Sequence, residues 1–391
     1  MNAAVLSNRI AVRYYFDHNA TTPVSPEVFQ AMEPVFTQVF GNASSIHADG
    51  QQARAILDQA RRNVAEMLGT RAEEIVFTSG GTEADNLAIF GVMGEGDHII
   101  TTSVEHPAVL QAAGTLPSVT VVPVDSQGLV DPDDIRRAIR PDTRLISVMH
   151  VNNELGVIQP VQNISLMARE AGILFHCDGV QAVGKIPLNL STLGADLYAD
   201  LYTISAHKIY GPKGMGALYV RKGTIVRPAL YGGPHERKMR AGTENVAGAA
   251  GFGRAAQWVM RESAVEMTRQ QALRDRLEET VRGQVAGVHI NGCGAPRVAN
   301  TSNIRFDGID SEPLLIALDL QGFAVSSGSA CSSGATEPSH VLSAIGLTRE
   351  QARSSIRVSL GRSNDAAQVD ALCGAIASSV ARLRKLAPAY V

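Results

Sequence analysis

Short apolar segments alternate with amphipathic helical patterns between about residues 74 and 220. The pattern predicts strands at 74–78, 98–102, 119–123, 144–149, 173–177, 201–205 and 216–220, and helices between several of them at 82–93, 107–115, 131–139 and 160–171. Strands that alternate with helices form βαβ units and a mostly parallel sheet. Ligands of such sheets bind at the carboxyl ends of the strands. The residues that follow each strand are therefore the first candidates for a functional site.

The pattern changes after a long helix, which we predict from about 244 to 282 as a connector between two parts of the chain. Beyond it, strands near 299–306, 323–326 and 355–360 are interleaved with helices near 311–320, 338–345 and 364–386. This order predicts a smaller α+β domain. No Pro- or Ser-rich linker separates the two parts, so we expect them to be packed together.

The segment ADLYADLY at 195–202 repeats four residues in tandem where the 201–205 strand begins. Because four is an even number, the alternation of strand side chains between the two faces survives the repeat. We expect the extra residues to bulge out as a loop and to leave the strand intact.

Composition and charge exclude several classes of protein. Of 391 residues, 35 are Lys or Arg and 38 are Asp or Glu, so the net charge is 35 − 38 = −3, which argues against a nucleic-acid binder that relies on a large positive charge. The four cysteines, Cys177, Cys293, Cys331 and Cys373, lie far apart and form no CxxC, which excludes a disulfide scaffold or zinc ribbon and is typical of a reducing compartment. No secretory signal and no apolar run of roughly 18 residues is present, so we expect a cytoplasmic protein without a membrane span.

The segment TSGGTEADN at 78–86 follows one predicted strand and opens a predicted helix. Its Ser79, Gly80, Gly81 and Thr82 offer N–H groups and hydroxyls at a helix N-terminus, where a phosphate binds. The segment lacks the Lys-Ser/Thr ending of a P-loop. A Gly-rich turn with Thr82 as the helix N-cap is the alternative.

Asp178 and Lys208 follow two other predicted strands. Asp178, in HCDGVQ, needs a partner at a strand end, such as the protonated ring nitrogen of a cofactor, unless it is an ordinary cap or loop residue. Lys208, in SAHKIYGPKG, can form a Schiff base if its surroundings lower its pKa, unless it is a surface lysine. A phosphate loop, an acid and a lysine are together the groups that pyridoxal phosphate requires. We expect His176 and Cys177, beside Asp178, to be core residues.

Two further segments place polar side chains after strands. His106, in SVEHPAV, can stack on a flat ring or move protons, unless it is a core or helix histidine. Asn152 and Asn153, in VNNELG, can donate to a phenolate oxygen or a carboxylate, unless they form a turn.

Cys331 lies in SSGSACSSGATEPSH at 326–340, where small side chains offer little to pack. We expect a mobile loop with an exposed thiol, which is a candidate nucleophile, with a neutral loop cysteine as the alternative. Arg357 lies in a strand pattern that otherwise indicates burial, and a buried arginine needs an anion. That anion is either a substrate carboxylate or an internal carboxylate.

Eight motifs now give the chain a resemblance to a known family. In order they are GNASSIH (41–47), TSGGTEADN, VEHPAV, VNNELG, HCDGVQAVGK, SAHKIYGPKG, RAGTEN (240–245) and SSGSACSSG. The chain resembles the cysteine desulfurases of group I, the NifS- and IscS-like branch of the class V, fold-type I pyridoxal-phosphate enzymes. The resemblance implies a large α/β domain at 17–262, with a mostly parallel sheet between helices. It also implies a smaller α+β domain, formed by 1–16 and 263–391, that carries the mobile cysteine loop.

The resemblance, carried over motif by motif, assigns cofactor contacts. It implies that Lys208 holds pyridoxal phosphate as a Schiff base and that Asp178 pairs with the pyridine nitrogen. Gln181 pairs with the phenolic oxygen, and His106 stacks on the ring and assists proton transfer. The other implied cofactor contacts are Asn153 and the phosphate ligands Gly81, Thr82, Ser205, His207 and, from the other subunit of a homodimer, Thr243.

The resemblance also implies the reaction. Asn153 and Arg357 hold the carboxylate of L-cysteine, and Cys331 attacks the substrate sulfur, leaving alanine and a protein persulfide. A selenocysteine lyase or another class V enzyme is the alternative. The implied acceptors are sulfur-accepting proteins such as an iron–sulfur scaffold, with no resident metal, although Cys331 could transiently ligate a cluster. Longer relatives dock the scaffold with a C-terminal tail that is short here, LRKLAPAYV at 383–391.

Overall fold

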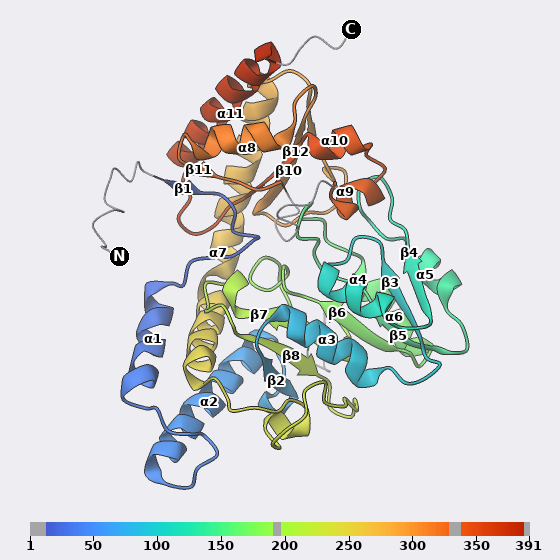
Figure 1. The fold of residues 1–391 in the computed structure, drawn as a ribbon, viewed down its shortest axis with the longest axis vertical. Helices are drawn as coiled ribbons and strands as arrows, with labels where there is room; N and C mark the ends of the chain where they lie inside the picture. The colour runs from blue at the N-terminus through green and yellow to red at the C-terminus, as the bar shows by residue number, and fades with distance from the viewer. Residues whose placement is uncertain (1–12, 191–196, 328–337, 387–391) are drawn as a thin grey trace.

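The structure is a computed structural model that describes residues 13–190, 197–327 and 338–386. Its central sheet has the strand order β2-β8-β7-β6-β5-β3-β4 (Figure 1). The strands are β2 (Ile75–Thr78), β3 (His98–Thr102), β4 (Val119–Val122), β5 (Thr143–Ser147), β6 (Leu174–Asp178), β7 (Leu201–Ser205) and β8 (Gly216–Val220). β8 runs antiparallel to β2 and β7, whereas the other neighbours are parallel. The predicted strands and the mostly parallel sheet are therefore confirmed.

Helices cover both faces of this sheet. Ile146 of β5 packs in one core with α2 (Ala48–Met67), α5 (Pro132–Ala138) and α6 (Val161–Glu170), whereas the adjacent Leu145 packs with α3 (Gly81–Val92) and α4 (Pro107–Gly114). Successive strand side chains point to opposite faces, so a sheet covered on both sides needs continuous apolar strands. This is why the strands read as short apolar runs in the sequence.

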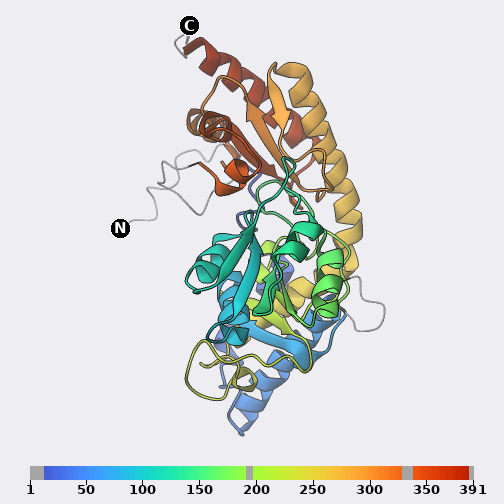
Figure 2. The ribbon, with the colours of Figure 1, turned by 90° about the vertical axis from the view of Figure 1, so that its right-hand side faces the viewer.

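The helix α7 (Val246–Gln284) connects the two parts of the molecule, as predicted for 244–282 (Figures 1 and 2). Phe252 and Trp258 near its start pack in the core of the large sheet, together with α2, and α1 (Pro26–Thr37) also contacts α7. Leu277 and Val281 near its end pack in a second core. One rigid rod therefore contributes to both cores, which joins the two parts without a flexible linker.

The second core belongs to a smaller antiparallel sheet of order β12-β10-β9. Its strands are β9 (Val288–Ile290), β10 (Thr301–Phe306) and β12 (Ser355–Ser359), and its helices include α8 (Ser311–Asp319) and α11 (Ala366–Leu386). β1 (Tyr14–Tyr15) pairs in parallel with β11 (Phe323–Ala324), and α9 (His340–Ala344) and α10 (Arg349–Arg353) lie between β11 and β12 in the sequence. β9, α10 and β1 were not among the predicted elements, and neither were the N-terminal helices α1 and α2. The domain limits 17–262, 1–16 and 263–391 stay a prediction.

The tandem repeat at 195–202 leaves β7 intact. Its last two residues begin β7, and Tyr202 and Thr203 pair in register with Cys177 and Asp178 of β6. Residues 197–200 have no regular secondary structure, as expected, but they do not bulge out, because Leu197 and Ala199 are buried. Residues 195 and 196 lie outside the described residues.

Candidate active site

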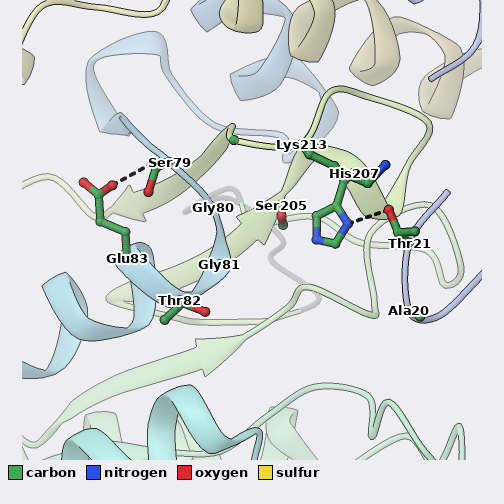
Figure 3. Close-up of a pocket in the computed structure, with 11 residues that line it drawn as sticks. Ala20, Thr21, Ser79, Gly80, Gly81, Thr82, Glu83, Ser205, His207 and Lys213 are labelled. Carbon is green, nitrogen blue, oxygen red and sulfur yellow. Dashed lines mark hydrogen bonds between the residues drawn. The ribbon is translucent and has the colours of Figure 1, made fainter. Parts of the chain in front are cut away.

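A cavity of about 440 Å³ lies where β2 ends and α3 begins (Figure 3). Its lining includes Ser79, Gly80, Gly81 and Thr82, together with Ser205 at the end of β7 and His207 just beyond it. Helix α3 begins at Gly81 and its N-cap position is Gly80, so the alternative of Thr82 as the N-cap is wrong. The N-terminus of α3 therefore faces a cavity large enough for a phosphate group.

Ser205 and His207 also contribute polar groups to this cavity, beside Lys213 and Glu83. The Ser205 hydroxyl is buried and has no hydrogen-bond partner among the described residues, a costly state that a bound oxygen would relieve. His207 shares a hydrogen bond of 3.0 Å with the Thr21 hydroxyl through Nδ1. Burial, followed by the charges of Lys208, Lys213 and Lys185, lowers the pKa of His207 to about 4, so its ring is neutral near pH 7. Ser205 and His207 thus offer neutral groups to an anion, and Lys213 in the wall adds a positive charge.

Asp178 ends β6 and is buried at the carboxyl edge of the sheet. Its Oδ1 accepts a hydrogen bond of 2.9 Å from the Val180 N–H. Burial raises the pKa of Asp178, and the nearby His106 and Lys208 only partly oppose this rise. The next position needs a glycine, because a Cβ at Gly179 would lie 2.0 Å from the Tyr202 ring. A cationic N–H group placed beside Asp178 would favour its ionised form.

Two more buried carboxyl groups, Asp85 of α3 and Glu105, interact electrostatically with Asp178. Burial raises the pKa of both, and Asp178 raises them further. Asp85 Oδ1 and Glu105 Oε2 have no hydrogen-bond partner among the described residues. Three buried carboxyl groups therefore lie near one another at this edge of the sheet, and a cationic group placed beside them would favour their ionised forms.

Replacing Glu105 with glutamine is expected to make the stability of the protein less dependent on pH. Burial, opposed by hydrogen bonds from Thr102 and Met149 and reinforced by Asp178, raises the pKa of Glu105 from 4.5 to about 8. Between these values the folded chain holds a proton that the unfolded chain has released, so stability falls as pH rises through this window. Relative to wild type, Glu105→Gln should gain on the order of a few kcal/mol between about pH 5 and about pH 8. Urea unfolding of the cofactor-free proteins measures this difference, and a difference that does not change with pH would contradict the assignment.

His106 lies at the N-cap of α4, and its Nδ1 accepts a hydrogen bond of 3.1 Å from the Ala108 N–H. Burial lowers the pKa of His106, and Lys208 and His340 add to this effect while Asp178 opposes it. The neutral ring therefore carries its proton on Nε2. His106 is therefore a helix histidine, which was the alternative interpretation. It also lies near Asp178 and Lys208, which the interpretation as a site residue requires.

Lys208 ends the short helix η3 (Ala206–Lys208) after β7. Its Nζ donates to the backbone oxygens of Asn19 and Ala20, at 2.6 and 2.7 Å. The surface-lysine alternative is therefore wrong. The Nε2 of Gln181 also donates to Asn19 O, at 2.9 Å. Gln181, in the turn after β6, and Lys208, which follows β7, therefore meet at one backbone carbonyl.

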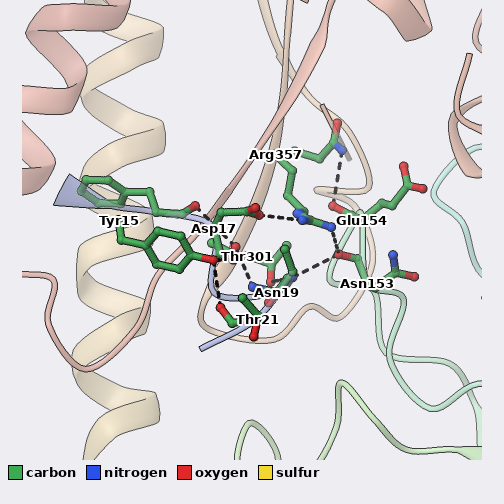
Figure 4. Close-up of polar contacts among 12 residues, drawn as sticks. Tyr15, Asp17, Asn19, Thr21, Asn153, Glu154, Thr301 and Arg357 are labelled. Atoms are coloured by element: carbon green, nitrogen blue, oxygen red, sulfur yellow. Dashed lines mark hydrogen bonds and ion pairs between the residues drawn. The ribbon is translucent and has the colours of Figure 1, made fainter. Parts of the chain in front are cut away.

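Arg357 of β12 is 2% exposed and forms an ion pair of 2.7 Å with Asp17 (Figure 4). Its Nη1 also donates to Asn153 O at 3.1 Å. Of the two anions considered for Arg357, a substrate carboxylate or an internal carboxylate, the internal one is therefore present as Asp17. The Asn152 side chain supports the turn by accepting from the N–H groups of Glu154 and Leu155, whereas Asn153 lies beside Arg357.

Two predicted site residues are not brought into this arrangement. Thr243 is exposed and does not line the cavity that holds Gly81 and Ser205. Cys331 lies outside the described residues. Among the other cysteines, Cys177 and Cys373 are buried and Cys293 is exposed. His176 is a core residue as expected, bonded to Ser147 and Thr203 at 2.8 and 3.0 Å.

Comparison with known proteins decides the family. A family model described as Aminotransferase class-V matches residues 14–372. The cysteine desulfurase IscS of Dictyoglomus turgidum is 46% identical over 382 residues, which are 96% of each chain. The chain belongs to the cysteine desulfurases of the class-V aminotransferase family. The cysteine desulfurase IscS of Methanosarcina thermophila is 45% identical over 96% of this chain and 93% of its own.

Solved structures of similar proteins agree with this family. A NifS-like protein matches with a TM-score of 0.87 and 35% identity, over 95% of this chain and 100% of that chain. The structure described as SspA in complex with cysteine matches with a TM-score of 0.79 and 34% identity, over 88% and 98% of the two chains. The predicted fold-type I architecture of a class-V cysteine desulfurase is therefore confirmed.

The cofactor of this cysteine desulfurase is pyridoxal phosphate, and the residues present fit it. The partnerless Ser205 hydroxyl and the start of α3 suit its phosphate. The buried acid Asp178 suits its ring nitrogen, and Lys208 suits its aldehyde. No helix in the described part of this desulfurase has the length and apolar character needed to cross a bilayer.

Sequence reasoning missed the residues of the N-terminal motif YFDHNATTP. Asp17 pairs with Arg357, Thr21 bonds to His207, and Asn19 accepts from both Lys208 and Gln181. It also missed Lys185, which donates to Asn19. The polar residues of this motif lie far in the sequence from their partners, so no local spacing connected them to the site.

Proposed function

We propose that this protein removes the sulfur of L-cysteine as L-alanine forms, stores it on Cys331 as a persulfide, and delivers it to sulfur-accepting proteins. The protein is an L-cysteine desulfurase that depends on pyridoxal phosphate. The observation that carries the proposal is the meeting of Asp178, His106 and Lys208 at the carboxyl edge of the sheet, beside an anion pocket. Cys331 adds the nucleophile that an aminotransferase does not need.

When bound, pyridoxal phosphate supplies an electron sink for the bond changes at the substrate carbons. Asp178 would hold the proton of the ring nitrogen, and Gln181 would donate to the phenolic oxygen. His106, neutral with its proton on Nε2, would stack on the ring and exchange a proton with the substrate. Gly81, Thr82, Ser205 and His207 would bind the phosphate, which would fix the ring in place.

The chain's own residues also position and consume the substrate. Arg357, held by Asp17, and Asn153 orient the substrate carboxylate. The Cys331 thiolate forms a bond to the substrate sulfur while the carbon–sulfur bond breaks, and the carbon takes up a proton to become the methyl group of alanine. Lys208, which can release and take up protons at Nζ, supplies that proton.

The direct test is to measure alanine and sulfide from L-cysteine in the presence of a thiol reductant, with selenocysteine run alongside. The expected result is one alanine per sulfide. Strong preference for selenocysteine would favour the selenocysteine lyase alternative, and pyruvate or transamination products in place of alanine would refute the proposal.

We also propose a homodimer. Thr243 is exposed on its own chain, which suits a residue that reaches the phosphate of a partner. Phe36 of α1 and Phe40 after it are 62% and 76% exposed, so an apolar surface is available for a second copy. Light scattering should give the mass of a dimer, and Thr243→Ala should weaken cofactor binding by roughly tenfold, the value of one hydrogen bond to a charged group. A monomer with full cofactor affinity would contradict this proposal.

An iron–sulfur scaffold protein and the cytoplasm are the acceptor and location that we propose. The names of the IscS relatives support the first, and the reducing compartment predicted from the cysteine content supports the second. Cluster reconstitution on a scaffold protein with this enzyme as the sulfur source would test delivery.

A further inference from the structure

Lys185 is a partly buried lysine beside the site to which neither the sequence nor the proposed reaction gives a role. It lies in the turn after β6, four residues after Gln181. Among the described residues no carboxylate lies within ion-pair distance of its Nζ. Burial of the amine, followed by the charges of Lys208 and Arg357, lowers the pKa of Lys185. Keeping a lysine here is costly, which calls for a compensating role.

The amine of Lys185 is directed at two side-chain carbonyl oxygens. Nζ donates to Asn19 Oδ1 at 3.0 Å and to Gln181 Oε1. On the other side of the same amide, Gln181 Nε2 donates to the backbone oxygen of Asn19 at 2.9 Å. Lys185, Gln181 and Asn19 thus form a closed set of hydrogen bonds.

This set permits only one orientation of the Gln181 amide. A rotated amide would place its NH₂ group against the amine of Lys185 and its oxygen against the carbonyl of Asn19, which would lose both hydrogen bonds. In the observed orientation, Nε2 carries two N–H groups and uses one of them for Asn19 O. The second N–H has no partner among the described residues.

Asn19 is fixed in the same way. Its Oδ1 accepts from Lys185 and from Asn300 Nδ2, both at 3.0 Å. Its Nδ2 donates to Asn153 O and Thr301 Oγ1 at 3.1 and 2.8 Å (Figure 4). The backbone oxygen of Asn19, which receives both Lys208 and Gln181, is therefore held in place from its side chain.

We propose that Lys185 is a positioning residue that fixes the amide of Gln181, so that the remaining N–H of Gln181 is available to the phenolic oxygen of pyridoxal phosphate. The inference rests on the proposed function, which pairs Gln181 with that oxygen. Lys185 itself does not touch the cofactor. It acts through Gln181. Without Lys185, the Gln181 amide can rotate and turn its Oε1, in place of an N–H, towards the phenolic oxygen of the cofactor.

A double-mutant cycle on cofactor affinity tests this role. The cofactor is removed from the purified enzyme, and the dissociation constant of pyridoxal phosphate is measured for wild type, Lys185→Met, Gln181→Ala and the double variant. Each single variant should bind roughly tenfold more weakly, as expected for one lost hydrogen bond to a charged oxygen. If Lys185 acts through Gln181, the double variant should bind within about twofold of Gln181→Ala. The absorption maximum of the bound cofactor should shift in the same direction in all three variants.

Three outcomes overturn the inference or separate it from the proposed function. Unchanged affinity in Lys185→Met, or losses that add in the double variant, would refute positioning through Gln181. Unchanged affinity in Gln181→Ala would refute the role of Gln181 in the proposed function. The exposed Lys222→Met is the matched control and should bind as wild type. If Lys185→Met does not fold, the same cycle with Lys185→Gln, a shorter neutral side chain, gives the same decision.

Discussion

Replacing Cys331 with alanine is expected to reduce sulfide release from L-cysteine by roughly 10³-fold or more while leaving the bound cofactor in place. The substrate sulfur needs a nucleophile to leave as a persulfide, and no cofactor contact is assigned to Cys331. Sulfide assays and the visible spectrum of the same preparation measure the two effects separately. Loss of the cofactor together with activity would show that Cys331 has a different role.

The other cysteines provide matched controls for this prediction. Cys177 and Cys373 are buried, and burial raises the pKa of the Cys373 thiol to about 11, so neither is a thiolate that can reach substrate. Cys293 is exposed, and Cys293→Ala removes a surface thiol without touching the site. It should keep the wild-type rate. Sulfide release that persists in Cys331→Ala and disappears in Cys293→Ala would show that Cys293, and not Cys331, is the nucleophile.

Replacing Lys208 with alanine is expected to remove the visible band near ~400 nm that lysine-bound pyridoxal phosphate gives. Alanine formation should fall by roughly 10³-fold or more, because loss of a proton-transfer group alone costs about 10²–10⁴. The backbone oxygens of Asn19 and Ala20 would also lose the amine that they accept from. Absorption spectra and product assays check both effects.

The exposed Lys222→Ala is the control for this variant and should keep both the band and the activity. Thermal unfolding of the cofactor-free proteins distinguishes loss of the covalent site from loss of the fold. A Lys208→Ala protein that remains yellow and active would place the cofactor on another lysine, such as Lys213 in the cavity wall.

The strands and the position of the site were predictable because their signals are local. Apolar runs of a few residues, covered on both faces, predicted each strand of the large sheet, and β6 and β7 end at Asp178 and two residues before His207. The connecting helix α7 was predictable because its helical pattern continues over nearly forty residues. β9 and α10 were missed because three and five residues give too little periodicity to recognise.

The tandem repeat shows where local reasoning was only partly right. Even parity correctly kept β7 in register with β6. The expectation that the extra residues bulge out was wrong for 197–200, because Leu197 and Ala199 bury apolar surface. The Asp200 carboxylate accepts from the Phe175 N–H at 2.9 Å, which further ties the segment to β6.

By itself, the sequence determined the strands of the sheet and pointed to segment 78–86, Asp178, His106, Lys208 and Cys331 as site candidates, since each of these signals depends on neighbours along the chain. Only the tertiary structure decided that Asp17 pairs with Arg357, 340 residues away, and that Asn19 and Lys185 enclose Gln181. Such contacts join the N-terminal segment to both parts of the molecule. Their partners are set by how the two cores pack around α7, a long-range arrangement that no local pattern of polar and apolar residues encodes.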